Sequence, residues 1–260
     1  MSFVARSTSP VSIVSKMSNA YAQTPNTSVV IPCFNEEGNL EGLRQKLEAT
    51  LGKLATLDVV LVDNGSTDST RAQVKQIAKQ LPRTTVVLVD RNMGYGHGIK
   101  AGLLAAKGEI VGWTHADLQT DPNDILSGLG LWEEQGGLFI KGRRIGRPIM
   151  DSAFSLGMGL LESILFKMTL KDINAQPTLF GREILDEVLS GPDDFSLDLF
   201  AMVIARKRGF NEVRFPVVFG KRFSGESNWN TSFVSRWRFI KRTLLFSFQL
   251  RKRIKSNVDN

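Results

Sequence analysis

The sequence predicts an α/β fold whose central sheet is open, mixed but mostly parallel, and flanked by helices. Four short runs with continuous apolar, β-branched centres alternate with helical stretches, and they lie at 28–32, 57–63, 84–90 and 108–114. Runs of this kind are typical of parallel strands that are covered on both faces. Each run is followed by polar or glycine-rich residues, and open α/β sheets bind ligands at the carboxyl ends of their strands. The chemistry is therefore expected at that edge.

Helices are expected after the first three strands, at about 38–53, 67–80 and 96–106. Short strand–helix–strand connections form right-handed crossovers between parallel strands. After Pro122 the alternation loosens. The later elements expected are a helix at 122–134, a strand at 138–142, a basic loop with the sequence KGRRIGR, an apolar helix at 151–170, a short strand leading into a helix within 174–183, a helix at 195–209, a strand at 212–219 and a loop at 221–230.

Composition indicates one globular domain between two atypical ends. The 260 residues are 42% hydrophobic and 23% charged, which is typical of a chain that can bury a core. We expect a flexible Ser/Thr-rich tail at 1–26, the main domain at 27–230, and a basic helix with a tail at 231–260. The single cysteine, Cys33, excludes an internal disulfide and a multi-cysteine zinc site. No uncharged apolar run approaches the ~20 residues that span a bilayer.

The net charge of +7 is concentrated near the C-terminus, where 206–260 contains fourteen Lys or Arg against three Asp or Glu. A helix at about 231–253 is basic and amphipathic, a pattern typical of helices that lie on membranes. We therefore expect peripheral membrane contact through 231–255. The alternative is that its apolar face packs on the domain or on a second copy in a homodimer. No nucleic acid is expected, because the aromatic residues follow a helical stripe rather than a base-stacking array. That stripe comprises Phe233, Trp237, Ile240, Leu244 and Phe248.

Two glycine-containing motifs follow the second and third strands. In DNGSTDST, Asp63 ends a buried strand and Gly65 permits a tight turn. The polar residues after Gly65 can cap the next helix, but a carboxylate at 63 can also accept hydrogen bonds from a ribose or a base, and this role is favoured. GYGHGIKAG loosely matches the dinucleotide-binding fingerprint. Three residues separate it from its strand, so a helix start that packs on the sheet is the simpler interpretation.

The segment HADLQTDP follows the fourth strand and is the most informative. Asp117 and Gln119 are two residues apart, so in an extended segment they face the same way. Two oxygen ligands on one side can hold Mg²⁺ or Mn²⁺ against a diphosphate. Capping of the following helix is already supplied by Asp121 and Pro122, which leaves Asp117 available for chemistry.

The ordered motifs VVIPCFNEE, VVLVDNGSTDST, RNMGYGHGIKAGL, HADLQTDP, GRR and RFSGES resemble family 2 glycosyltransferases of the GT-A type. The similarity is greatest to the polyprenyl-phosphate sugar transferases, the branch that contains dolichyl-phosphate mannose synthase. It extends from about Val29 to Asn230. The resemblance implies a GT-A fold, a UDP- or GDP-sugar donor, a divalent cation and inverting transfer of a hexose to a polyprenyl phosphate or a glycan precursor.

The resemblance also implies roles for particular residues. Asp117 matches the central acid of the metal motif D-A-D-L-Q, Gln119 matches its last member, and His115 stands at its first acid. Asp172 matches the acid of the D-x-x-S-G-F segment and is a catalytic candidate together with Asp117. The residues expected to contact the donor or the reacting phosphates are Pro32, Asn35, Glu36, Asp63, Gly65, Asn92, Lys100, Arg144, Arg222 and Ser227.

Three departures from the family pattern bear on this assignment. His115 replaces an acid, and an imidazole can still bind Mn²⁺; the alternative is a histidine that supports the site without touching the metal. The residues NAQP, 174–177, replace S-G-F and change the segment that recognises the acceptor. Asn228 stands where a lysine often follows the serine, which removes one phosphate partner.

The expected chemistry is attack of an acceptor oxygen on the anomeric carbon as the diphosphate departs. Metal on Asp117, with Arg144 and Arg222, would stabilise the departing charge. A phosphate acceptor is already anionic, whereas a hydroxyl acceptor needs a general base. Asp172 and Asp198 are the candidates for that base, although Asp198 lies in an apolar helix, where an ion pair is the alternative.

Two other function classes stay open at this stage. One is a nucleotide-sugar-binding protein without transfer activity, because His115 departs from the metal motif. The other is a nicotinamide-dependent oxidoreductase that uses the glycine fingerprint. That function would leave the polar segments DNGSTDS and HADLQTD without a role. For the glycosyltransferase, the expected location is the cytoplasm, at the inner face of the cytoplasmic membrane.

Overall fold

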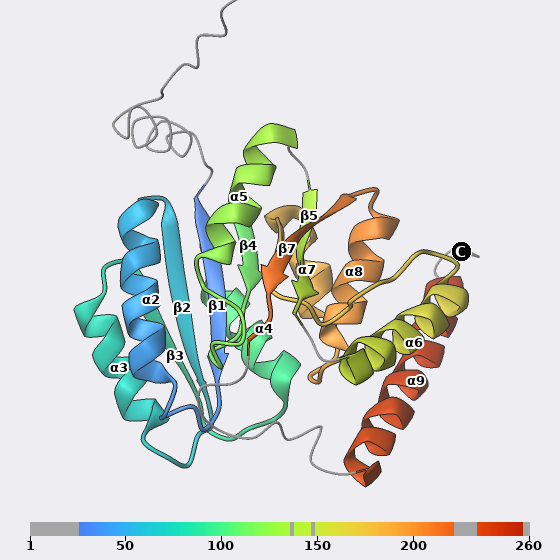
Figure 1. Ribbon diagram of the computed structural model, residues 1–260, viewed down its shortest axis with the longest axis horizontal. Coiled ribbons are helices and arrows are strands. Elements are labelled where there is room, and N and C mark those ends of the chain that lie inside the picture. The colour runs from blue at the N-terminus through green and yellow to red at the C-terminus, as the bar shows by residue number, and fades with distance from the viewer. Residues whose placement is uncertain (1–25, 136–137, 147–148, 221–232, 257–260) are drawn as a thin grey trace, which may run out of the picture.

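The computed structural model describes residues 26–135, 138–146, 149–220 and 233–256 (Figure 1). The tail expected at 1–26 and the loop expected at 221–230 therefore lie almost wholly outside the described residues. Within the described ranges, seven strands form one sheet in the order β3-β2-β1-β4-β6-β5-β7. The strands are β1 (Thr27–Cys33), β2 (Leu57–Asn64), β3 (Thr84–Val89), β4 (Ile110–Trp113), β5 (Leu138–Ile145), β6 (Thr178–Gly181) and β7 (Asn211–Val218).

The sheet is mixed but mostly parallel, as predicted. β1 pairs in parallel with β2 and β4, and β2 pairs in parallel with β3. β6 runs antiparallel between β4 and β5, and β7 returns parallel to β5. The carboxyl ends of all the parallel strands and the start of β6 therefore meet at one edge.

Helices cover both faces of the sheet (Figure 1). One buried cluster joins the sheet to α2 (Leu40–Lys53), α3 (Thr70–Gln80) and α5 (Asp124–Gln135). The other joins it to α4 (Tyr95–Ala105), α7 (Leu185–Leu189) and α8 (Leu197–Lys207). A short 3-10 turn, η1 (Arg182–Ile184), leads from β6 into α7. Burial on both faces explains why β1 and β2 read as continuous apolar runs.

The glycines of α4 have a packing role. A Cβ on Gly98 would overlap the Asn64 side chain, and a Cβ on Gly102 would overlap Val30 and Val62. These glycines let α4 approach the sheet closely, as the simpler interpretation of GYGHGIKAG predicted.

Two sequence expectations in the second half need correction. The KGRRIGR segment is not a loop throughout, because β5 continues to Ile145 and pairs with β7 from Leu138–Asn211 to Ile145–Val218. The apolar helix α6 (Ile149–Phe166) begins and ends earlier than the 151–170 expected. The extent of β5 depends on β7, a partner that is distant in sequence.

The C-terminal helix, α9 (Phe233–Ser256), lies beside α6 (Figure 1), and the Ser247 hydroxyl donates a hydrogen bond to Glu162 at 2.8 Å. Within 241–252, the part of α9 whose side chains are described, the buried positions are Thr243, Ser247 and Leu250, whereas Phe248 is 59% exposed. Phe248, which was placed in the aromatic stripe, is therefore not on the packed face. The side chains of 233–240, which include the rest of that stripe up to Ile240, lie outside the description.

Candidate active site

The loops that follow β1 and β2 are joined by hydrogen bonds at the carboxyl edge. Asn35, with a positive φ of 54°, accepts a hydrogen bond from the Thr67 N–H at 2.9 Å, and its own N–H donates to the Ser66 hydroxyl at 3.1 Å. The Glu36 N–H donates to the Thr70 hydroxyl at 2.8 Å. Asn35 and Glu36, both predicted to contact the nucleotide, are thereby held beside the loop after β2.

Asp63 is completely buried near the end of β2. It accepts hydrogen bonds from the Ser66 N–H at 3.1 Å and from Arg71 Nε at 2.6 Å. Arg71 also donates to the carbonyl of Val89 at 2.6 Å, which ties α3 to the end of β3. Asp63 therefore holds the turn after β2 and the start of α3 in place, a structural role that the sequence analysis did not favour. Its predicted contact with a base or ribose stays a prediction. Pro32 lies in β1, next to β2.

Two further predicted donor residues, Gly65 and Asn92, meet where the loop after β2 touches the turn before α4. Gly65 has a φ of 74°, and a Cβ there would overlap the backbone of Asn92. Asn92 shapes the turn by accepting a hydrogen bond from the Gly94 N–H at 2.8 Å. Lys100 points elsewhere and forms an ion pair with Asp193 at 2.8 Å. Its predicted contact with the donor stays a prediction.

Asp117 and Gln119 follow β4 at the centre of the edge. Asp117 is 3% exposed, and its Oδ1 accepts a hydrogen bond from the Gln119 N–H at 3.1 Å. Gln119 also bonds the segment after β7, since the Gly220 N–H donates to its carbonyl at 2.8 Å and its side-chain amide donates to the Gly220 carbonyl at 3.2 Å. Gly220, the last described residue after β7, is therefore held next to the Asp117 motif. Arg222 and Ser227, predicted to contact the diphosphate, lie outside the described residues.

A divalent cation fits this edge only with help from the donor. In the part of the chain that the structure describes, no group of three or more His, Cys, Asp or Glu could hold a metal. Asp117 and Gln119 supply oxygen atoms, which suit Mg²⁺ and Mn²⁺. The remaining ligands would come from the diphosphate and water, as is usual for Mg²⁺ in nucleotide sites.

Arg144 and Asp172 form an ion pair where β5 ends. Asp172 accepts hydrogen bonds from the Arg144 backbone N–H at 2.8 Å and from its Nε at 2.7 Å. Burial tends to raise the pKa of Asp172, but hydrogen bonds and charge from Arg144 outweigh it, and the net shift is downward. Asp172 therefore stays ionised and holds Arg144 in place. The guanidinium also lies 5.4 Å from the centre of the Phe219 ring, within cation–π range.

Asp198, the other candidate base, lies in a buried polar cluster. Both Asp198 and Lys141 are completely buried, and their Oδ1 and Nζ atoms are 2.8 Å apart. Burial lowers the pKa of Lys141, although the charge of Asp198 opposes that shift. Gln176 donates to Asp198 at 3.0 Å and Tyr95 donates to it at 3.2 Å. The ion pair considered as the alternative is present, and general-base action by Asp198 is not part of our proposal.

His115 joins this cluster from the Asp117 segment. Its Nε2 lies 2.9 Å from the Tyr95 hydroxyl, and the two rings meet edge to face. Sequence reasoning missed Tyr95, Lys141 and Gln176. The available signal was Lys141 itself, a lysine inside the apolar strand LFIKG, since a buried lysine needs an anionic partner.

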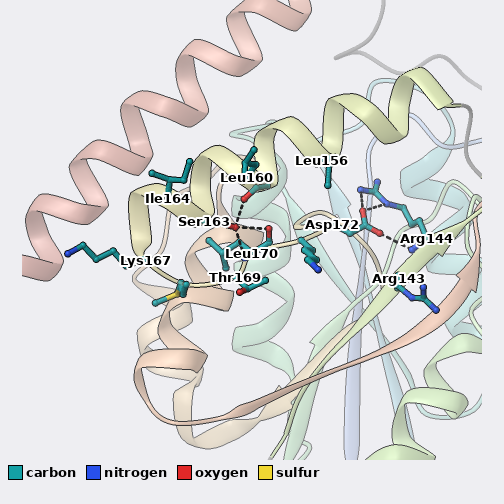
Figure 2. A pocket seen from close by; sticks show the side chains of 13 residues that line it. Arg143, Arg144, Leu156, Leu160, Ser163, Ile164, Lys167, Thr169, Leu170 and Asp172 are labelled. Carbon is teal, nitrogen blue, oxygen red and sulfur yellow. Dashed lines mark hydrogen bonds and ion pairs between the residues drawn. The ribbon is translucent and has the colours of Figure 1, made fainter.

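A cavity of about 610 Å³ opens next to the Arg144–Asp172 pair. One wall is the outer side of α6, where Leu156, Leu160 and Ile164 are 68%, 62% and 71% exposed. Figure 2 shows Arg144 and Asp172 at one end of the cavity and Lys167 at the other. We call it the α6 groove, and it combines an apolar wall with cationic ends. Its lining residues are Arg143, Arg144, Leu156, Gly159, Leu160, Ser163, Ile164, Lys167, Met168, Thr169, Leu170, Lys171 and Asp172.

The mostly parallel sheet, with an Asp-x-Gln segment after β4, has the arrangement of the GT-A fold, and solved glycosyltransferases share this fold. A mannosyltransferase from Pyrobaculum calidifontis, solved with GDP-mannose and Mn²⁺, is 21% identical, with a TM-score of 0.63 over 94% of this chain and 72% of that one. Glucosyl-3-phosphoglycerate synthase from Mycobacterium tuberculosis, solved with Mn²⁺ and UDP, is 15% identical, with a TM-score of 0.66 over 96% and 86% of the two chains.

The family model for Glycosyl transferase family 2 matches residues 28–183, more than half of the chain, so the chain belongs to that family. An uncharacterized glycosyltransferase from Synechocystis is 29% identical over 87% of this chain and 70% of its own length. The undecaprenyl-phosphate 4-deoxy-4-formamido-L-arabinose transferase from Pseudomonas fluorescens is 27% identical over 78% of this chain and 60% of its own length. The predicted family and fold are confirmed, and the oxidoreductase alternative is excluded.

Proposed function

We propose that this glycosyltransferase moves a hexose from a UDP- or GDP-sugar to a polyprenyl phosphate, with inversion at the anomeric carbon. The α6 groove carries the proposal, because a lipid phosphate needs an apolar wall for its chain and a cation for its head group. The Arg144 guanidinium lies where the groove reaches the carboxyl edge of the sheet. Relatives named as acting on undecaprenyl phosphate support this choice of acceptor.

The lowered pKa of Asp172 fits an acceptor that needs no general base. Because a phosphate oxygen is already anionic, Asp172 can remain ionised and keep Arg144 oriented toward the groove. Asp117 and Gln119 would hold the divalent cation, which neutralises charge on the departing diphosphate. Arg144 would bring the acceptor phosphate close despite the negative charge of the donor.

We also propose that the enzyme works on the inner face of the cytoplasmic membrane. No helix among the described residues is long and apolar enough to cross a bilayer. Exposed apolar side chains nevertheless gather on two adjacent helices, with Leu160 and Ile164 on α6 and Leu245 and Phe248 on α9. Lys167 follows α6, and Lys241, Arg242 and Lys252 are exposed on α9. Each basic residue near an anionic surface contributes about 1 kcal/mol.

The transfer test combines the chain with UDP-glucose or GDP-mannose, Mn²⁺ and undecaprenyl phosphate in detergent. We expect release of nucleoside diphosphate together with sugar in the lipid extract, and none of the latter when undecaprenol replaces the phosphate. A panel extended to the other common UDP- and GDP-hexoses guards against a wrong donor. Donor binding without transfer to any lipid phosphate in that panel would favour the binding-protein alternative.

The membrane test uses flotation with anionic and neutral vesicles. We expect the whole chain to float with anionic vesicles at low salt and to detach at high salt. Leu160→Glu should weaken flotation, whereas Leu104→Glu, on α4 at a residue 72% exposed, should not. Equal loss in both variants, or no flotation at all, would contradict the proposed surface.

A further inference from the structure

The segment 167–177 joins α6 to β6, and we call it the Asp172 loop. Asp172 has a φ of 43°, in the left-handed region that few residues other than glycine adopt. A conformation of this kind persists where neighbouring groups fix the backbone. The Asp172 carboxylate accepts from the Arg144 N–H at 2.8 Å and from its Nε at 2.7 Å. The partners of the Asp172 main chain therefore decide where that carboxylate, and with it Arg144, is placed.

Arg214, on β7, is one of these partners. Its Nη1 donates hydrogen bonds to the carbonyl of Asp172 at 3.3 Å and to the carbonyl of Gly142 at 3.2 Å. A terminal guanidinium nitrogen has two protons, so both bonds can exist at once. Gly142 lies in β5, two residues before Arg144. Arg214 therefore fastens the Asp172 loop to the strand that also carries Arg144.

The orientation of Arg214 is set by Glu212, which lies two residues earlier on the same face of β7. Glu212 Oε1 accepts a hydrogen bond from Arg214 Nε, and its Oε2 accepts from Arg206 Nε at 2.9 Å. The side chains of Glu212 and Arg214 are only 7% and 15% exposed. Among the described residues, the Arg206 side chain bonds Glu212 and no part of the Asp172 loop. The two arginines thus share one carboxylate but differ in their reach.

We propose that Arg214 is a positioning residue that fixes the Asp172 main chain, so that the Asp172 carboxylate holds Arg144 at the end of the α6 groove for the acceptor phosphate. The inference rests on the proposed function for the identity of the acceptor. Arg214 is not one of the described residues that line the α6 groove, so it acts through Asp172. Against the effect of burial, hydrogen bonds from Arg144 and the charges of both arginines lower the pKa of Asp172, which keeps it ionised.

The first experiment measures the order of Arg144 in the ligand-free protein. Relaxation of ¹⁵N-labelled arginine Nε groups reports how firmly each guanidinium is held, and Arg144→Lys assigns the Arg144 signal. We expect an ordered Arg144 Nε in the unmodified chain and a mobile one in Arg214→Met. An equally ordered Arg144 in both chains would overturn the inference, whether or not the chain transfers sugar.

Arg206→Met is the matched control, because it breaks an ion pair with the same carboxylate and leaves the bonds of Arg214 to the Asp172 loop. We expect Arg144 to stay ordered in this variant. Equal mobility of Arg144 in Arg206→Met and Arg214→Met would show a general structural role and overturn the inference. Arg214→Gln, whose side chain is two atoms shorter, has the same expected result as Arg214→Met and decides the question if the latter does not fold.

The second experiment measures the affinity for farnesyl phosphate, a short polyprenyl phosphate. We expect about five- to tenfold weaker binding in Arg214→Met, the cost of about one oriented hydrogen bond, with the KM for the sugar donor unchanged. Arg144→Met should lose at least as much. Adding Arg214→Met to it should cost less than about twofold more, because both changes act at Arg144.

Full additivity of the two losses, or a rise in the donor KM equal to the loss of farnesyl phosphate affinity, would overturn the inference and leave the proposed function standing. Absence of farnesyl phosphate binding by the unmodified chain would instead contradict the proposed acceptor. The order of Arg144 in the first experiment would still decide the role of Arg214.

Discussion

Lys141→Met should be among the most damaging single changes in this chain. Lys141 and Asp198 are both completely buried and 2.8 Å apart. At an effective dielectric constant of about 20, two charges at that distance attract by about 6 kcal/mol. Most of this attraction offsets the cost of removing both charges from water, so the pair itself adds little to stability. Removing one partner is different, because the other charge then remains buried alone.

The expected cost of Lys141→Met is about 3 kcal/mol of unfolding free energy. Breaking a buried pair costs about 3–5 kcal/mol, and the lower end applies because Asp198 keeps its hydrogen bonds from Gln176 and Tyr95. For a chain of this size, about 2–4 °C is lost per kcal/mol, which gives a fall in Tm of roughly 6–12 °C. Asp198→Asn should cost less, because burial already lowers the pKa of Lys141 and allows it to lose its proton.

Urea unfolding followed by circular dichroism measures these costs, and thermal unfolding provides a second estimate. The double variant Lys141→Met/Asp198→Asn should lose at least 1 kcal/mol less than the sum of the single losses, since neither charge is left alone. Lys75→Met, at an exposed position on α3, is the control and should change stability by less than about 0.5 kcal/mol. Strict additivity, or a loss below about 1 kcal/mol for Lys141→Met, would refute the reasoning.

Three other predictions concern the donor edge and the contact between α6 and α9. Asp117→Asn should lower kcat by about 10²–10³ with the fold intact, because it removes one electrostatic stabiliser of the diphosphate; unchanged turnover at saturating Mn²⁺ would contradict the metal role. Asp63→Ala should mainly raise the donor KM, because a contact with the base or ribose is equally strong in the ground state and the transition state. A collapsed kcat with an unchanged KM would show that Asp63 does not have this role. Burial raises the pKa of Glu162 from 4.5 to about 7, against the opposing hydrogen bond from Ser247. The folded state thus binds the extra proton, so stability should fall as pH rises from about 4.5 through 7. Glu162→Gln should remove that fall and raise Tm at pH 8, and equal pH profiles would rule out Glu162 as the cause.

Local signals in the sequence were enough to predict the order of the strands and helices and the sheet edge where the chemistry is expected. Continuous apolar runs marked β1 and β2, and helical periodicity with terminal glycines and prolines marked the helices. These signals are local, because they depend on a few neighbouring residues and on burial of both sheet faces. The motifs after β1, β2 and β4 likewise predicted the carboxyl edge, since parallel strands bring those ends together.

Contacts between segments that are distant in the chain could not be predicted and are evident in the folded structure alone. β6 lies between β4 and β5 and runs antiparallel to both, and β5 pairs with β7 through Arg144 as far as Ile145. Lys141 forms an ion pair with Asp198, and no local signal in the sequence predicted which residue would be its partner. The Tyr95 hydroxyl likewise contacts His115, Gln176 and Asp198, which come from three other segments of the chain. Residue type and spacing do not predict contacts of this kind. The partners of a buried charge, such as Lys141 and Asp198, come together only when the whole sheet has formed.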